Sequence, residues 1–285
     1  MGEVGIDLIK IRFPPQFSPT FIFSMQKIIL ITGASSGIGK ALAEQMAGSG
    51  NTLLLAARNM EALEKLKITC ENKGAEVHLF KADLSQNRGV ELLADQVTAI
   101  VPYISVIINN AGISQRSPAE MTAEQVDRDI MELNFFSPVR LTKLLWPLFL
   151  SAKNANIVNI SSVTGTFGFP QRSAYAASKH AMEGFFESWM LENKHLHIHF
   201  TTVAPGRILT NISYNALKGD GSKHQEMDKG QEKGISAEKC AAKIIDAISR
   251  NRRKVYIVKE ERILLIAYRF FPSLFVYLVK KLGLK

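Results

Sequence analysis

A chain of 285 residues with 46% hydrophobic content can bury the core of one α/β domain, and we expect a single domain. The net charge of +9 does not indicate a nucleic-acid-binding protein, because residues 250–285 contain ten Lys or Arg against two Glu and the rest is nearly neutral. The two cysteines, Cys70 and Cys240, have no disulfide or metal-ligand spacing, so we expect free thiols of a reducing compartment and no metal site.

The first 25 residues lack an uninterrupted apolar stretch behind a basic start, which argues against a secretory signal and favours a cytoplasmic protein. We expect this extension to be poorly ordered. A strand is predicted to begin two residues after Met25, and our hypothesis is that Met25 is the native start, which the intact mass of the native protein would test.

Short apolar runs alternate with longer segments of helical period from residue 26 to residue 260, the pattern of βα units around a parallel sheet. Strands are predicted at 27–32, 52–57, 77–81, 105–109, 156–160, 198–203 and 255–258. Helices are predicted at 38–48, 60–73, 86–101, 122–151, 174–194 and 236–249. The fold class is therefore α/β, a doubly wound Rossmann domain with a seven-stranded parallel sheet.

The first predicted strand runs into a glycine-rich turn, TGASSGIG, at residues 32–39. Glycine permits the tight turn and lets backbone N–H groups reach a pyrophosphate at the start of the next helix. An ordinary glycine turn is the alternative, but the strand–turn–helix setting favours a dinucleotide site. The predicted cofactor-binding residues of this loop are Gly33, Ser35, Ser36, Gly37, Ile38 and Gly39.

The end of the second strand carries Arg58, where an NAD site usually has an acidic residue that binds the ribose 2′-hydroxyl. A guanidinium offers planar donors to a 2′-phosphate, so we expect NADP (NADPH), with NAD the less favoured cofactor. The alternative is that Arg58 is a solvated charge at a strand end.

Tyr175 and Lys179 are four residues apart in a predicted helix, which places their side chains on one face about a turn apart. A phenol is a poor acid or base at neutral pH, and a nearby cation stabilises its phenolate form. The pair therefore indicates proton transfer.

With these motifs the sequence resembles the short-chain dehydrogenase/reductase family over nearly all of residues 27–260, most closely its lipid-associated NADP-dependent branch. The matching motifs occur in order along the chain. They are Thr32–Gly39, Asp83, Asn109–Gly112, Asn134, Ser161-Ser162, Tyr175 with Lys179, and Pro205-Gly206 with Thr210.

The resemblance implies a catalytic tetrad of Asn134, Ser162, Tyr175 and Lys179. Tyr175 would protonate the carbonyl oxygen during reduction, and Lys179 would lower the tyrosine pKa and hold the nicotinamide ribose. Ser162, in preference to Ser161, would bind the substrate oxygen. Asn134 would hold a water that links Lys179 to solvent.

The resemblance also implies further cofactor contacts. Asp83 would bind the adenine amino group, and Thr210 would contact the carboxamide or the diphosphate. The remaining contacts would come from Asn110, Ala111, Gly112, Pro205 and Gly206. Asp83 and Asn110 could instead cap strand ends. Ser36 stands where many NADP-preferring members have a basic residue, so the expected NADP specificity depends mainly on Arg58.

Residues 211–234 are polar and rich in Gly and Lys, and they follow the sixth predicted strand. Because ligands of open α/β sheets bind outside the carboxyl ends of strands, we expect this segment to be a mobile loop and a substrate lid. A surface insertion without function is the alternative.

The C-terminal tail, 261–285, holds an apolar and aromatic run at 263–279 that Arg269 and Pro272 interrupt. The run is short for a spanning helix, and with flanking basic residues it is typical of an amphipathic segment on an anionic membrane surface. The same residues could instead cover the substrate pocket or a subunit interface, and both interpretations stay open.

These observations favour an NADP-dependent oxidoreductase that reduces a lipophilic ketone or a 3-ketoacyl-type substrate, with peripheral contact at the cytoplasmic face of a membrane. The alternatives are a non-catalytic NADP sensor, which would be expected to have a damaged tetrad, and a membrane-associated scaffold of the same fold. The resemblance further implies a homo-oligomer formed through the helices 122–151 and 174–194.

Overall fold

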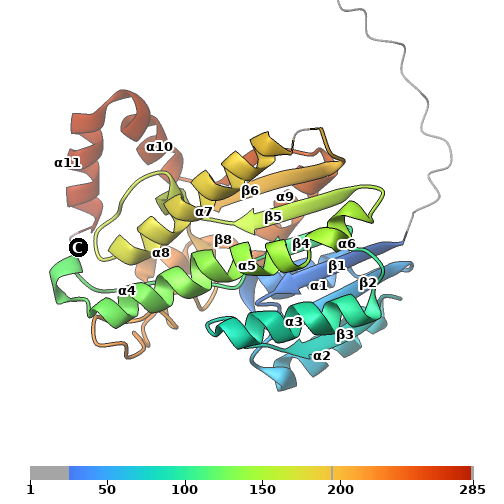
Figure 1. Cartoon of the computed structure of the whole chain (residues 1–285). Helices are drawn as coiled ribbons and strands as arrows, with labels where there is room; N and C mark the ends of the chain where they lie inside the picture. The colour runs from blue at the N-terminus through green and yellow to red at the C-terminus, as the bar shows by residue number, and fades with distance from the viewer. Residues whose placement is uncertain (1–25, 194, 284–285) are drawn as a thin grey trace, which may run out of the picture.

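The computed structural model describes residues 26–283 except residue 194, so the predicted N-terminal extension, the proposed start at Met25 and the last two residues lie outside it. Its centre is a seven-stranded parallel sheet with the strand order β3-β2-β1-β4-β5-β6-β9 (Figure 1). The strands are β1 (Lys27–Thr32), β2 (Asn51–Ala57), β3 (Glu76–Lys81), β4 (Val106–Asn109), β5 (Ala155–Ile160), β6 (Ile198–Pro205) and β9 (Lys254–Ile257). The predicted Rossmann fold and its seven strands are confirmed.

Helices cover both faces of the sheet. One face packs against α3 (Asn87–Ile100), α5 (Ser137–Leu144) and α7 (Ser173–Glu192). The other packs against α1 (Gly37–Met46), α2 (Met60–Glu71) and α9 (Ala237–Ser249).

The central strands are apolar along their whole length because both of their faces are buried. In β1, Ile28 and Leu30 lie in the core of the α7 side, and Ile29 and Ile31 lie in the core of the α1 side. This two-sided burial explains why the strands could be located from continuous apolar runs.

The prediction of one helix over 122–151 is wrong. The structure has a short 3₁₀ turn, η1 (Ala119–Met121), then α4 (Glu124–Met131), a π-helical turn, η2 (Glu132–Phe136), α5, and α6 (Trp146–Leu150). Pro147 lacks an N–H group and cannot continue the hydrogen bonding of α5, so the helix ends before it. The π turn carries Asn134, which is fully buried.

The predicted lid, residues 211–234, connects two short strands that pair with each other, β7 (Ile208–Leu209) and β8 (Ile235–Ser236). The segment predicted as a mobile loop contains some regular structure, and its role as a lid stays a prediction. The segment contains α8 (Lys229–Glu232), and Leu217 forms β-bridges with Gln115 and Lys223. The bridge to Gln115 ties this segment to the chain that follows β4.

The C-terminal tail forms a hairpin of two helices, α10 (Glu261–Phe270) and α11 (Pro272–Gly283), beyond the carboxyl ends of β5 and β6 (Figure 1). Pro272 begins the second helix, as expected of a proline in the first helical turn. Leu264 and Val279 pack against Val163 and Phe167, which follow β5. The hairpin therefore covers the part of the molecule where the catalytic motifs were predicted.

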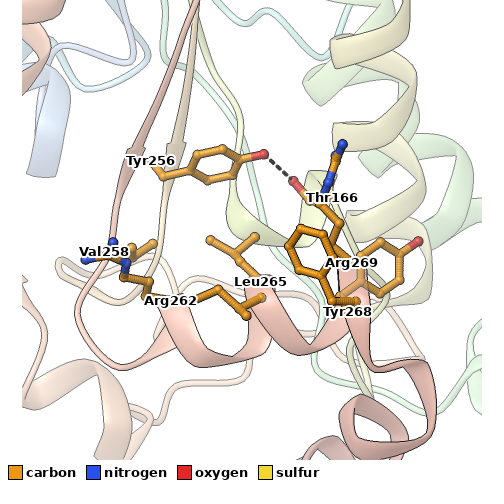
Figure 2. A pocket seen from close by; sticks show the side chains of 9 residues that line it. Thr166, Tyr256, Val258, Arg262, Leu265, Tyr268 and Arg269 are labelled. Carbon is orange, nitrogen blue, oxygen red and sulfur yellow. Dashed lines mark hydrogen bonds between the residues drawn. The ribbon is translucent and has the colours of Figure 1, made fainter.

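On the outer side of α10, Tyr256 and Thr166 share a hydrogen bond of 3.3 Å between their hydroxyl groups (Figure 2). Leu265 and Tyr268 line an open pocket beside this pair. None of the described helices is long and apolar enough to cross a membrane.

Candidate active site

Helix α7 places Tyr175 and Lys179 on one buried face. The ammonium nitrogen of Lys179 lies 5.8 Å from the centre of the Tyr175 ring and donates a 2.8 Å hydrogen bond to the carbonyl oxygen of Ile160. Since Ile160 is the last residue of β5, this bond holds the helix face against the carboxyl end of a central strand. The structure thus brings the predicted pair together at the edge of the sheet where α/β proteins bind ligands.

The two serines after β5 separate into different environments. The Ser161 hydroxyl donates a 2.7 Å hydrogen bond to the carboxylate of Glu183, whereas Ser162 lines the same pocket as Tyr175. The Ser162 oxygen accepts hydrogen bonds from the backbone and the hydroxyl of Thr164, which fix its position. This arrangement favours the choice of Ser162 over Ser161 as the group that faces a ligand.

Asn134 lies in the π turn, and its side-chain amide bonds to protein groups outside that turn. Its oxygen accepts from the N–H of Ile113, and its nitrogen donates to the carbonyl of Ile113 and the hydroxyl of Ser178, at 2.9 to 3.0 Å. The bonds join α7 to the chain after β4. The water that the resemblance places between Asn134 and Lys179 stays a prediction.

Burial raises the pKa of the Tyr175 phenol, while a hydrogen bond with Ser162 and the charges of Arg116 and Arg172 act in the opposite direction. The resemblance implied this lowering of the phenol's pKa for Lys179, and the structure adds Arg116 and Arg172 as two further cations that favour the phenolate.

Burial also lowers the pKa of Lys179 to about 8, and the nearby Glu183 carboxylate partly opposes this effect. At neutral pH the ammonium therefore keeps its proton, but it loses that proton much more easily than a surface lysine does.

The glycine turn has the features that a pyrophosphate requires. Gly37 has φ +55°, and a side chain on Gly39 would lie 2.5 Å from the Gly33 carbonyl oxygen, so neither position accepts a larger residue without a shift. Ser36, the N-cap of α1, makes no side-chain capping bond, which leaves the first N–H groups of the helix free for a ligand. The predicted loop residues thus fit a dinucleotide phosphate.

Other predicted cofactor residues lie around this turn. Asn110 donates to the carbonyls of Thr32 and Gly33, so it braces the turn from the next strand. A Cβ on Gly37 would meet the Thr210 side chain at 3.0 Å, which puts Thr210 beside the phosphate loop. Ala111 and Gly112 follow Asn110, and a Cβ on Gly112 would lie 2.9 Å from the Asn134 side-chain oxygen.

Arg58 and Asp83 lie at the ends of β2 and β3, and both are exposed. The glycine turn is next to Arg58, because the N–H of Ala34 bonds to the carbonyl of Ala56 at 3.3 Å. The Asp83 carboxylate accepts bonds from the N–H and hydroxyl of Ser85 through one oxygen. These bonds use one carboxylate oxygen of Asp83, and its role in adenine binding stays a prediction.

The pocket around Tyr175 is lined by residues from four regions of the chain. Ser162, Val163 and Phe167 come from the segment after β5, and Gly206 follows Pro205 at the end of β6. The segment predicted as a lid and the tail also line the pocket. Their contributions are Ile212, Asp228, Gln231, Glu261 and Leu264.

The charged residues of this pocket were not predicted as site residues; they are Arg116, Arg172, Arg207, Asp228 and Glu261, and the first two and Asp228 lie together. Two signals pointed toward the first two: Arg116 comes four residues after Gly112, and Arg172 comes three residues before Tyr175. Arg116 thus follows one of the matching motifs and Arg172 precedes another, and both arginines lie in loops at the carboxyl edge of the sheet. Nothing in the polar lid distinguished Asp228.

Comparison with known proteins agrees with this geometry. The family model described as short chain dehydrogenase matches residues 27–220. The chain is 36% identical to the mouse (Mus musculus) protein named dehydrogenase/reductase SDR family member 7B over 255 residues, 88% of this chain and 76% of the mouse protein.

Among solved structures, a short-chain dehydrogenase from Streptomyces avermitilis matches with TM-score 0.76 and 28% identity, over 92% of this chain and 98% of its own. A short-chain dehydrogenase from Sphingobium yanoikuyae in complex with NADPH matches with TM-score 0.71 and 24% identity, over 85% and 93% of the two chains. The second likeness shows the fold alone.

The low pKa of Lys179 predicts a pH-dependent stability. Between pH 8 and 10.5 the unfolded chain keeps the lysine proton that the folded protein has released, so rising pH should favour the folded state. From pH 7 to 9.5 we expect this residue to add on the order of 2 kcal/mol to the free energy of unfolding. Urea unfolding of the wild type and Lys179→Met at both pH values measures the effect. An identical pH response of the two proteins would contradict it.

Proposed function

Because this chain belongs to the short-chain dehydrogenase/reductase family, and so to the oxidoreductases, we propose that it transfers a hydride between NADP(H) and a carbonyl or secondary alcohol. The favoured direction is reduction of a lipophilic ketone or a 3-ketoacyl-type substrate. One observation carries this proposal: Tyr175, Ser162 and Lys179 lie together at the carboxyl edge of the sheet, beside a glycine turn that fits a pyrophosphate.

Each residue of the proposed tetrad has a role that its position supports. The bound cofactor supplies a hydride to the carbonyl carbon. Tyr175 gives its proton to the carbonyl oxygen, and Ser162 donates a hydrogen bond to the same oxygen. The Lys179 ammonium stabilises the phenolate that remains, while Asn134 ties the chain after β4 to α7.

The Tyr175→Phe variant tests the reaction. NADPH oxidation that depends on ketones of increasing chain length should fall by about 10²–10⁴-fold, because the proton donor is lost. Tyr256→Phe is the matched control, since it removes a hydroxyl outside this pocket and should leave turnover unchanged.

Two results would favour the alternatives. Ketone-dependent turnover that is absent from the wild type while NADPH still binds indicates a cofactor sensor. A cellular function that survives Tyr175→Phe but not removal of residues 263–285 indicates a scaffold.

The choice of NADP over NAD is supported by Arg58, which ends β2 next to the glycine turn and is exposed. A carboxylate at this position would repel a 2′-phosphate, whereas a guanidinium can bind it through two donors.

Replacement of Arg58 by Ala should therefore weaken NADPH binding by about 10-fold or more and change NADH binding by less than about 2-fold. Fluorescence titration of both cofactors provides the comparison, with NADH as the internal control. An equal loss for the two cofactors would refute the assignment.

The tail supports the proposal of a lipophilic substrate and of peripheral membrane contact. Its inner side covers the pocket through Leu264, as one sequence interpretation expected. Its outer side exposes large apolar residues beside the basic Arg262 and Arg269. These exposed residues are Ile263, Ile266, Tyr268, Phe270, Phe271, Leu274, Val276 and Tyr277.

The double variant Phe270→Ser and Phe271→Ser tests the membrane contact. Cosedimentation of the protein with vesicles of phosphatidylcholine and phosphatidylserine should fall about 10-fold or more, because two exposed aromatic side chains no longer enter the interface. Ile68→Ser removes a similarly exposed apolar side chain on α2 and should have no effect. Equal binding of all three proteins would contradict the proposal.

A homo-oligomer remains part of the proposed function. Phe136 and Leu144 on the segments after α4, and Leu191 on α7, are exposed apolar side chains on the helices where family members associate. The mass of the protein in solution, measured by light scattering, tests this part.

A further inference from the structure

Two arginines of the substrate pocket share one carboxylate. The guanidinium of Arg116 donates to both oxygens of Asp228, with a shortest distance of 2.6 Å. Arg172 donates to the same Asp228 oxygen at 2.9 Å. The Arg116 side chain is only 6% exposed, so this cluster lies inside the pocket and is not a surface ion pair.

The cluster carries more positive than negative charge. Two guanidinium groups face the single carboxylate of Asp228. The remaining charged residues of the pocket, Arg207 and Glu261, form an ion pair with each other at 4.0 Å. Burial, followed by the charge of Arg116, lowers the pKa of Arg172 to about 10. A second anionic group in this pocket would therefore be stabilised.

Asp228 is an anion that the protein itself supplies. Burial would raise the pKa of its carboxyl group, but the hydrogen bonds and charges of the two arginines hold the pKa below its ordinary value. The carboxylate is thus ionised at neutral pH and occupies the position where an external acid would meet both guanidinium groups.

The position of Asp228 on the lid allows it to leave. The lid stays attached through Leu217, whose N–H bonds to the carbonyl of Ser114 and whose carbonyl accepts from the N–H of Arg116. Ten residues separate Leu217 from Asp228, so a shift of the carboxylate need not break this attachment. The pocket is partly open to solvent and holds about 130 Å³ of accessible space, which departure of the Asp228 carboxylate would enlarge.

We propose that Arg116 and Arg172 form a subsite for an acidic group of the substrate, and that the Asp228 carboxylate occupies this subsite until the substrate displaces it. The inference rests on the proposed function for the reacting carbonyl. An apolar cluster of Val163, Phe167 and Leu264 also lines the pocket. The substrate class is therefore an amphiphilic ketone, with a carboxylate or phosphate near one end and an apolar chain beneath the tail.

Binding of unreactive acids tests the subsite without any need for turnover. Calorimetry on the full chain saturated with NADPH compares octanoate, octyl phosphate and octanamide, which share one chain and differ in charge. We expect at least one acid to bind about 10-fold or more tightly than octanamide. Arg172→Gln should weaken binding of the acid by about 10-fold. The isosteric Asp228→Asn should strengthen binding of the acid by a similar factor, because the carboxylate that competes with it is gone.

Arg207→Gln is the matched control, since it removes the same charge from the same pocket at a residue that does not contact Asp228. Its effect should stay below about 2-fold. Equal affinity of the wild type for the acids and octanamide overturns the subsite. A loss of acid affinity in Arg207→Gln as large as the loss in Arg172→Gln also overturns it. Unchanged acid affinity in Asp228→Asn overturns the displacement of Asp228.

The outcomes also separate this inference from the proposed reaction. Tight, arginine-dependent acid binding without ketone reduction would leave the subsite standing and remove the proposed function. Ketone reduction without selective acid binding would leave the proposed function standing and remove the subsite.

Discussion

The bond between the Lys179 ammonium and the Ile160 carbonyl positions the whole candidate site. It fixes α7 against the carboxyl end of β5, and because Tyr175 precedes Lys179 by one helical turn, the phenol is fixed with it. The same helix accepts a bond from Asn134 at Ser178, so two central loops are tied to it. The phenol therefore faces the pocket only because a buried charge finds a main-chain oxygen at the sheet edge.

The charged residues of the pocket lie in loops and insertions outside the strands and helices of the βα core. Arg116 and Arg172 lie in loops at the carboxyl edge, and Asp228 lies in the insertion between β7 and β8. The tail adds Leu264 and Glu261, whose carboxylate accepts from the N–H groups of Arg207 and Lys259. In the proposed enzyme the core thus supplies the cofactor site and the proton path, while the C-terminal third shapes the space for substrate.

The sequence predicted the sheet well because its strands are buried on both faces and read as continuous apolar runs, as in Leu53, Leu54 and Leu55. It failed where helical periodicity continued through breaks. The segment 122–151 keeps an apolar period across the π turn and across Pro147, so the pattern alone could not show that it contains several helices. The tail was ambiguous for a related reason: its apolar residues face both the pocket and the outside, and a linear pattern does not separate the two.

What the sequence determined by itself is the chemistry that depends on local spacing. The glycine turn after the first strand, the four-residue interval from Tyr175 to Lys179 and the two adjacent serines are set within one turn or one helix. Only the tertiary structure decided which charges meet in the pocket. Asp228 is 112 residues from Arg116 and 56 from Arg172, and its contact with them exists only because the lid folds back over the carboxyl edge of the sheet. No local pattern encodes such a contact, since its energy arises from burial and charge that form after the chain has folded.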